Sequence, residues 1–264
     1  MSLSINPAAM ASDRSASVAG VRINLTSLSL AISALLRDAE AGQGFTLFTL
    51  NLDHVVKLRR GAAFREAYER ATYVTADGWP IVWLAHRAAP RLHRAAGADL
   101  VEPLCEVAAR HAIALYFIGP GEASRHAAIA ILRQRYPGLQ IAGAESPAVS
   151  TGGNTPEASV LAERIVKSGA RICLVSLGAP KQELLAAELS ARCPAVGFIC
   201  VGAALDFISG QTRRAPHWMR RSGLEWFWRL ACEPRRLAKR YGNCAYVFAL
   251  LALGVETVRV ESPS

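Results

Sequence analysis

The chain has 264 residues, of which 52% are hydrophobic and 19% are charged. This composition excludes an intrinsically disordered protein, and the length allows one large domain or two small ones. The formal net charge of +9 favours anionic partners: nucleic acid, phosphorylated substrates or an acidic membrane surface.

The basic charge is concentrated near the C-terminus. Residues 213–240 carry eight arginines and one lysine against two glutamates, a net charge of +7 that leaves only +2 for the rest of the chain. This segment is therefore the part that we expect to bind an anion.

The first 20 residues are small and polar and contain no apolar core. They predict a flexible leader and no signal peptide. The six cysteines include no C-x-x-C pair, and several lie in apolar runs. We therefore expect them to be reduced core residues of a cytosolic protein.

Apolar runs with small or polar residues at their ends predict buried strands. They span residues 45–51, 72–77, 114–121, 139–145, 171–180 and 195–207. Segments of helical periodicity lie between them; in the segment 155–169, Thr155 is the expected N-cap, Pro156 the first helical residue and Gly169 the residue past the end. Strands that alternate with helices predict an α/β protein with a Rossmann-like, mostly parallel sheet and helices on both faces.

Ligands of such sheets bind at the carboxyl ends of the strands. Thr49 and Asn51 end the first predicted strand, where a hydroxyl and an amide suit a sugar or a nucleobase; both residue types are also common in turns and helix caps. Asp77 ends the second strand, where a carboxylate serves either as a general base or as a helix N-cap.

Two later segments contain groups suited to phosphate. The guanidinium of Arg94 has the shape to clamp a diphosphate, and the alternative is a solvated surface arginine. The loop 178–183, which includes Gln182, leads from a glycine turn into a helix N-terminus. That arrangement suits a phosphate or a sugar hydroxyl.

The run 114–121 favours a different class of protein. Gly119-Pro120-Gly121 is a degenerate dinucleotide-binding fingerprint in a βαβ context, with Ser124 where the fingerprint has glycine or alanine and Glu145 at the end of the next strand. An NAD-dependent oxidoreductase is therefore the alternative function. The sequence has no D-x-D motif and no His, Cys or carboxylate cluster with metal-ligand spacing, so we expect no metal and no other cofactor.

Arginines alternate with tryptophans in residues 214–241. On a helix beginning at Trp218, the aromatic residues fall near one face and Arg221 and Arg229 on another, a pattern typical of an interfacial helix. The alternatives are a basic helix packed on the sheet and a nucleic-acid-binding tail. The apolar run 245–255 is too short to span a bilayer of about 30 Å and is either a core or an interfacial helix.

Together these segments resemble the WecG/TagA/CpsF family of bacterial glycosyltransferases. The resemblance covers roughly residues 45–241, and its last two blocks are the most specific. The matching segments are TLN at 49–51, ADG at 76–78, RAAGADL at 94–100, GAPKQE at 178–183, VGAALDFISGQTRRAP at 201–216 and GLEWFWRLACEPRRL at 223–237.

The resemblance implies inverting, metal-independent transfer of a hexose or N-acetylhexosamine-type sugar from a UDP-sugar to an undecaprenyl-diphosphate-linked sugar, in bacterial surface or exopolysaccharide biosynthesis. It implies that Asp77 is catalytic and that Arg94 binds the diphosphate. The implied sugar-site residues are Thr49, Asn51 and Gln182. This chain departs from the family at Trp79-Pro80, where members often have a small or aliphatic residue and a second glycine, so the resemblance does not assign the donor sugar.

We accordingly divide the chain into a leader (1–20), an α/β catalytic domain (21–212) and a basic, aromatic, helical segment that associates with the membrane (213–264). We then expect the protein to be cytoplasmic and peripheral on the inner face of the bacterial plasma membrane. Its expected partner is an anionic membrane surface, and we expect it not to bind nucleic acid. The sequence leaves open whether it forms a homo-oligomer. The arginines expected to contact a diphosphate or the membrane are Arg213, Arg214, Arg221, Arg229, Arg235 and Arg236.

Overall fold

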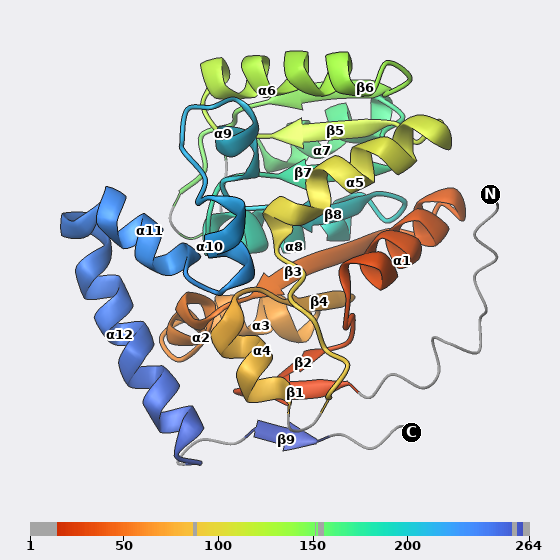
Figure 1. The fold of residues 1–264 in the computed structure, drawn as a ribbon. Coiled ribbons are helices and arrows are strands. Elements are labelled where there is room, and N and C mark those ends of the chain that lie inside the picture. Colours follow the sequence, from red (N-terminus) through yellow and green to blue (C-terminus); the bar gives the residue numbers. More distant parts are fainter. Residues whose placement is uncertain (1–14, 87–88, 151, 153–155, 255–257, 261–264) are drawn as a thin grey trace.

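The computed structural model describes residues 15–86, 89–150, 152, 156–254 and 258–260. Its centre is a six-stranded, all-parallel sheet with the strand order β4-β3-β8-β7-β5-β6 (Figure 1). All six predicted strands are present, and the predicted Rossmann-like α/β class is confirmed. The strands are β3 (Phe45–Leu50), β4 (Tyr73–Ala76), β5 (Leu115–Ile118), β6 (Ile141–Glu145), β7 (Ile172–Val175) and β8 (Gly197–Cys200).

The central strands are buried on both faces of the sheet. Every residue of β3, β5, β7 and β8 is buried. In β3, Phe48 and Leu50 join one hydrophobic cluster, whereas Phe45 and Leu47 join the cluster on the opposite face. Because both faces are covered, these strands read as continuous apolar runs and not as an alternation of polar and apolar residues.

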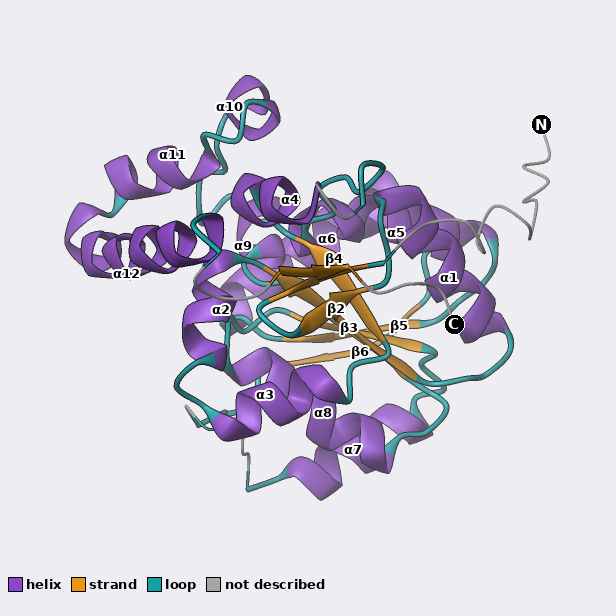
Figure 2. Cartoon of the chain, turned by 90° about the horizontal axis from the view of Figure 1, so that it is seen from below, coloured by secondary structure: helices purple, strands orange, loops and turns teal. Residues whose placement is uncertain are grey.

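Helices cover both faces, as predicted (Figure 2). On one face lie α2 (Leu52–Leu58), α3 (Ala62–Glu69), α7 (Ala158–Lys167) and α8 (Lys181–Arg192). On the other lie α1 (Leu28–Glu40), α5 (Gly97–Arg110), α6 (Glu122–Arg135) and the short α9 (Ala204–Ile208). Helix α4 (Trp79–His86) follows β4 directly and shares the cluster of the first face.

The predicted start of the helix in 155–169 is wrong. Helix α7 begins at Ala158 with Glu157 as its N-cap, and Pro156 lies in the turn before it; Thr155 lies outside the described residues. The helix begins where Ala158 and Leu161 become buried, so packing sets its start. Its end is as predicted, with Gly169 at φ +74° just beyond the last turn.

A second, three-stranded antiparallel sheet joins the two ends of the chain. It contains β2 (Val21–Ile23), β1 (Ala16–Val18) and β9 (Val258–Val260) in that order. Strand β1 lies inside the predicted leader, and Ala16 and Val18 are buried. Strand β9 lies inside the segment that was expected to be helical. Short strands like these give little local signal, and their pairing brings together residues far apart in the sequence.

The C-terminal segment forms three helices and not one helix from Trp218. Helices α10 (His217–Arg221) and α11 (Glu225–Cys232) are separated by Gly223, whose φ of +75° is in the left-handed region that interrupts a helix. Helix α12 (Pro234–Ala252) packs against α2 and α4.

The apolar run 245–255 is both core and surface. Val247 and Leu251 are buried, whereas Tyr246 and Leu253 are exposed; Val255 lies outside the described residues. Among the helices of the described residues, none combines the length and apolar character needed to cross a membrane. Of the six cysteines, five are buried, as expected, and Cys232 is exposed.

Candidate active site

The carboxyl edge of the sheet presents Asp77 immediately after β4. Its backbone N–H donates to the carbonyl of Leu50, at the end of neighbouring β3, over 2.7 Å. Gly78 then turns the chain into α4 with a φ of +90°, a conformation that glycine adopts without steric cost. The Asp77 carboxylate is thereby fixed beside the chain that leaves β3.

The surroundings of Asp77 raise the pKa of its carboxyl. Burial raises the pKa of this carboxyl above its ordinary value, and the charge of Glu225 raises it further. The charges of Arg94 and Arg229 and a hydrogen bond from Asn51 act in the opposite direction. The side chain still keeps 28% of its surface exposed, so it can reach a ligand. A carboxylate with a raised pKa and an open side suits a general base.

Arg94 lies next to Asp77 and is held in place by a second carboxylate. Its Nη1 is 3.9 Å from Asp77 Oδ1, and its Nη2 donates to Asp99 Oδ2 at 2.5 Å. Asp99 belongs to the first turn of α5, which can approach β8 closely because it begins at Gly97: a Cβ there would lie 2.7 Å from the carbonyl oxygen of Cys200. This glycine allows α5 to bring Asp99 to the edge.

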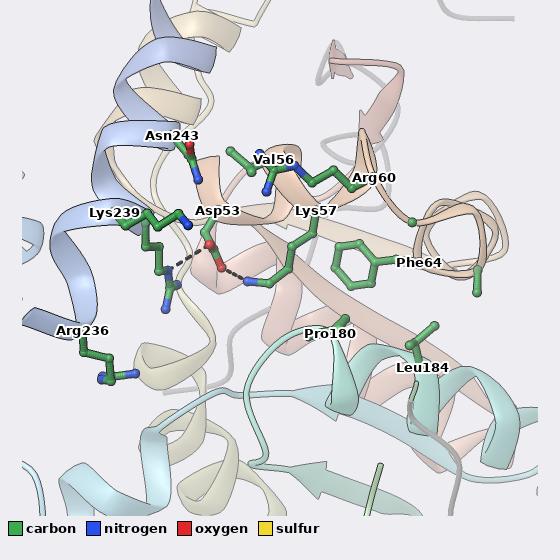
Figure 3. A pocket seen from close by; sticks show the side chains of 13 residues that line it. Asp53, Val56, Lys57, Arg60, Phe64, Pro180, Leu184, Arg236, Lys239 and Asn243 are labelled. Carbon is green, nitrogen blue, oxygen red and sulfur yellow. Dashed lines mark hydrogen bonds and ion pairs between the residues drawn. The ribbon is translucent and has the colours of Figure 1, made fainter. Parts of the chain in front are cut away.

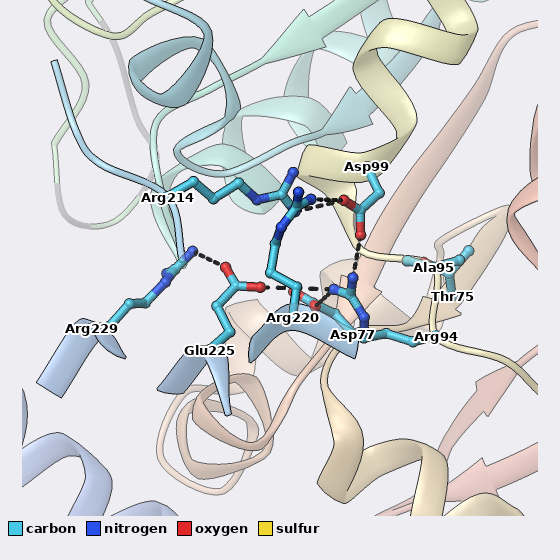
Figure 4. Close-up of polar contacts among 9 residues, drawn as sticks. All are labelled: Thr75, Asp77, Arg94, Ala95, Asp99, Arg214, Arg220, Glu225 and Arg229. Atoms are coloured by element: carbon cyan, nitrogen blue, oxygen red, sulfur yellow. Dashed lines mark hydrogen bonds and ion pairs between the residues drawn. The ribbon is translucent and has the colours of Figure 1, made fainter. Parts of the chain in front are cut away.

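The C-terminal segment completes this cluster (Figure 4). Asp99 Oδ1 accepts a hydrogen bond from Arg214 Nη2 at 2.6 Å and lies 3.6 Å from Arg220 Nη1. Glu225 Oε2 lies 4.0 Å from Arg94 Nη1, and its Oε1 accepts from Arg229 Nη2 at 3.1 Å. Segments more than 100 residues apart thus form one charged site. Its members are Asp77, Arg94, Asp99, Arg214, Arg220, Glu225 and Arg229.

The ring of Phe207 orients two of these arginines. The guanidinium carbon of Arg214 lies 5.5 Å from the ring centroid and that of Arg229 lies 5.3 Å from it. Cations over an aromatic face are attracted to its electron density. Since Phe207 is on α9, after β8, these contacts tie the C-terminal segment to the sheet edge.

The predicted sugar-site residues occupy three different settings. Thr49 is buried within β3. Asn51 caps α2, because its side chain accepts from the N–H of His54 at 3.0 Å, and it also hydrogen-bonds to Asp77. Gln182 is buried, and both ends of its amide bond inside the protein: Oε1 accepts from the N–H of Gly202 at 3.0 Å and Nε2 donates to Glu183 at 2.8 Å. Gln182 therefore orients the turn after β8, and its contact with a sugar stays a prediction.

The six predicted C-terminal arginines fall into two groups, members of the charged site and exposed residues. Arg214 and Arg229 belong to the site, whereas the other four, Arg213, Arg221, Arg235 and Arg236, are exposed. Three further site residues were not selected from the sequence: Asp99, Arg220 and Glu225. The available signal was that Asp99 and Glu225 are carboxylates within blocks rich in arginine, where a partly buried cation needs a compensating anion.

A buried polar contact joins Glu183 of α8 to His54 of α2. Burial raises the pKa of Glu183 to about 7. Its Oε1 is 3.9 Å from Nε2 of His54, whose pKa burial and the charge of Arg240 lower to about 3. His54 is therefore neutral at physiological pH, and its contact with Glu183 is not a salt bridge. Nδ1 of His54 also lies 2.6 Å from the hydroxyl of Tyr68.

The residues of the dinucleotide fingerprint are used in packing. Ser124 donates to Asp206 at 2.6 Å. Glu145, the carboxylate expected at a ribose, accepts two hydrogen bonds from Arg164, at 2.8 and 2.5 Å, and one from Tyr116. With this carboxylate engaged in a structural ion pair, the NAD alternative is disfavoured. In the part of the chain that the structure describes, no group of three or more His, Cys, Asp or Glu residues is placed to hold a metal ion.

Comparison with known protein families gives the class of the protein. The sequence model described as "Glycosyl transferase WecG/TagA/CpsF family" matches residues 16–260. The match extends from β1 to β9 and includes every residue of the charged site. The chain therefore belongs to the WecG/TagA/CpsF family of glycosyltransferases.

Proposed function

We propose that this glycosyltransferase is an inverting enzyme that transfers a hexose or N-acetylhexosamine-type sugar from a UDP-sugar to a lipid-diphosphate-linked sugar. The single observation that carries the proposal is the arrangement at the carboxyl edge. A carboxyl with a raised pKa, Asp77, lies 3.9 Å from a guanidinium that Asp99 holds in place. A base and a fixed cation side by side are what such a displacement needs.

In the proposed reaction, an acceptor hydroxyl attacks the anomeric carbon while the bond from that carbon to the β-phosphate oxygen breaks. Asp77 takes the hydroxyl proton, and UDP leaves from the opposite face of the sugar with the bonding electron pair. Arg94 offsets the negative charge that grows on the β-phosphate, with Arg214 and Arg220 next to it on Asp99. Charges already in position replace the role that a divalent cation has in metal-dependent transferases, so we propose metal-independent transfer.

The distribution of exposed apolar side chains supports a membrane-linked acceptor. Of the ten large hydrophobic residues exposed in the described part of the chain, eight lie on or next to α4, α10, α11 and α12. Aromatic residues at a surface with exposed arginines are typical of proteins that dock on an anionic membrane interface. The eight residues are Trp79, Trp83, Trp218, Leu224, Trp226, Phe227, Tyr246 and Leu253.

Helix α4 enlarges the surface that was predicted for docking. Trp83 lies 5.5 Å from Phe248 of α12, and Trp79 lies 6.2 Å from it, measured between ring centroids. Trp79 lies two residues after Asp77, the proposed base. A protein bound to the membrane through this aromatic cluster would therefore hold Asp77 close to a lipid-linked acceptor, and we propose a peripheral location on the inner face of the plasma membrane.

The test is an assay of UDP release with a panel of UDP-sugars and a lipid-diphosphate-sugar acceptor. We expect one donor to give acceptor-dependent UDP release that EDTA does not change. UDP, and not NAD, should raise the melting temperature of the protein. Failure of every donor together with stabilisation by NAD would reject the proposal, and activity lost in EDTA and restored by magnesium or manganese would reject its metal-free form.

A further inference from the structure

A groove between α2 and α12 is separate from the charged site at Asp77. Its main cavity has a volume of about 580 Å³ and is lined by residues of α2, α3, α12 and the start of α8 (Figure 3). A second cavity of about 270 Å³ continues it along the same two helices, and the two share Val56, Arg60 and Asn243. Together they form one elongated depression.

The main cavity has a strong excess of positive charge. Five basic residues line it against a single carboxylate, Asp53. Asp53 is already engaged, because it pairs with Lys57 on its own helix and with Arg240 Nε at 2.9 Å. The basic lining residues are Lys57, Arg60, Arg236, Lys239 and Arg240.

Two of these cations have no anionic partner in the described residues. Arg60 and Lys239 are exposed and lie on two opposite walls, the first just after α2 and the second on α12 (Figure 3). Arg236, by contrast, pairs with Glu233. Unpaired cations that face one cavity from both sides repel each other, and an anion placed between them removes that repulsion.

Apolar side chains line the rest of the groove, together with Asn243 and, in the second cavity, Arg59. Val56, Phe64 and Leu184 contribute to the main cavity, and Val247 and Tyr246 to the second one. Tyr246 is exposed and lies on the same helix as Lys239. A ligand that fills the whole depression would therefore have an anionic head and an apolar chain.

We propose that the α2–α12 groove binds a phosphate ester that carries an apolar chain, as in a membrane lipid, with the phosphate between Arg60 and Lys239 and the chain along Val56 and Tyr246. Phosphate matches the cations, because its several oxygens accept bonds from arginine and lysine at once. The inference does not depend on the proposed reaction, since none of these residues belongs to the site at Asp77.

The experiment measures binding to the full-length protein by calorimetry with three soluble probes. Dihexanoyl phosphatidic acid represents a bulk phospholipid, farnesyl diphosphate represents a prenyl-linked substrate, and inorganic pyrophosphate carries no chain. We expect at least one of the two lipid probes to bind more tightly than pyrophosphate. The preference between those two identifies the source of the phosphate.

Variants then locate the site. Arg60→Glu/Lys239→Glu should weaken the lipid probe about tenfold, because two attractive charges become repulsive. The matched control, Arg133→Glu/Arg171→Glu, changes the net charge equally at exposed arginines of α6 and of the residue before β7, and should leave binding unchanged. Tyr246→Ser should weaken the lipid probe and leave pyrophosphate unaffected. Thermal melting of each variant verifies that it is folded.

Two results would overturn the inference. Equal loss of affinity in the groove variant and the control variant would show a general charge effect and no site. Pyrophosphate bound as tightly as both lipid probes, with no effect of Tyr246→Ser, would show a plain anion site without a place for the chain.

Discussion

The C-terminal segment has three pairs of adjacent arginines, and in two of them, Arg213-Arg214 and Arg220-Arg221, the structure separates the members. Arg214 and Arg220 lie within reach of Asp99, with side chains only 20% and 25% exposed. Their neighbours Arg213 and Arg221 are exposed, and within the described residues their side chains have no ion-pair partner. One basic segment therefore contributes to two regions: an inner charged site and an outer surface.

The charges of the inner site and of the outer surface differ in the free energy of desolvation that they require and in the effect that they can have on a ligand. An inner cation loses water, so carboxylates must compensate it, and its position is then fixed well enough to stabilise a transition state. An outer cation keeps its water and acts through the general field at the surface, which salt screens. Inner substitutions should therefore change chemistry or stability, and outer ones should change attraction to a membrane.

The largest expected effect tests the inner region directly. Asp77→Asn keeps the shape of the side chain and removes its basicity, so turnover should fall on the order of a hundredfold or more. The measurement is UDP release under saturating donor and acceptor. Near-normal turnover in a folded variant would remove Asp77 from the role of general base.

The next prediction concerns stability against pH at the buried Glu183. Its pKa is about 7 in the folded protein against an ordinary value of 4.5, so the unfolded chain loses this proton first as the pH rises. Stability should fall between those two pH values and then level off, by roughly 3 kcal/mol if the whole shift applies.

Urea unfolding at a series of pH values measures this change. Glu183→Gln carries no titrating proton, so its stability should lack this fall, while Glu163→Gln, at an exposed position, should keep it. A parallel pH dependence in the protein and in Glu183→Gln would contradict the raised pKa.

A smaller effect should separate the two members of one arginine pair. Arg214→Gln removes a hydrogen bond to Asp99 and a cation next to Arg94, and should lower transfer to a short-chain, water-soluble acceptor about tenfold. Arg213→Gln is the matched control and should transfer at the normal rate. Equal rates in both variants would show that the inner position of Arg214 has no catalytic consequence.

Point variants test the catalytic role of the C-terminal segment better than removal of residues 213–264 does. Helix α12 buries Cys244, Val247 and Leu251 against the body of the protein, and β9 pairs with β1. Truncation before Arg213 would expose that core, so a loss of activity would reflect unfolding as much as catalysis.

The smallest predicted effect belongs to the outer surface. Arg235→Glu/Arg236→Glu should weaken binding to phosphatidylglycerol vesicles several-fold at low salt and less at high salt. An environment-sensitive dye on Cys232, the one exposed cysteine of the six, reports the binding. Transfer to the soluble acceptor should be unchanged, and vesicle binding equal to that of the starting protein would exclude these two arginines from the docking surface.

The sequence by itself determined the sheet and the residues at its edge. The six strands follow from apolar runs that are buried on both faces. Asp77 was selected because polar residues at the ends of parallel strands face ligands, and Arg94 because a guanidinium has the shape to clamp a diphosphate. These are local patterns, and each needs only a few consecutive residues. Where local signal was weak, as at β1, β9 and the break at Gly223, the expected boundaries were wrong.

The tertiary structure alone decided which charges share a site. Asp99 and Arg214 are 115 positions apart in the sequence, and no local pattern relates them. The position of α10 brings Arg220 within reach of Asp99 and leaves Arg221 exposed, although the two are identical neighbours in the chain. The α2–α12 groove likewise exists only because a helix from the end of the chain lies against one that follows the first strand of the sheet, and such contacts depend on the whole fold.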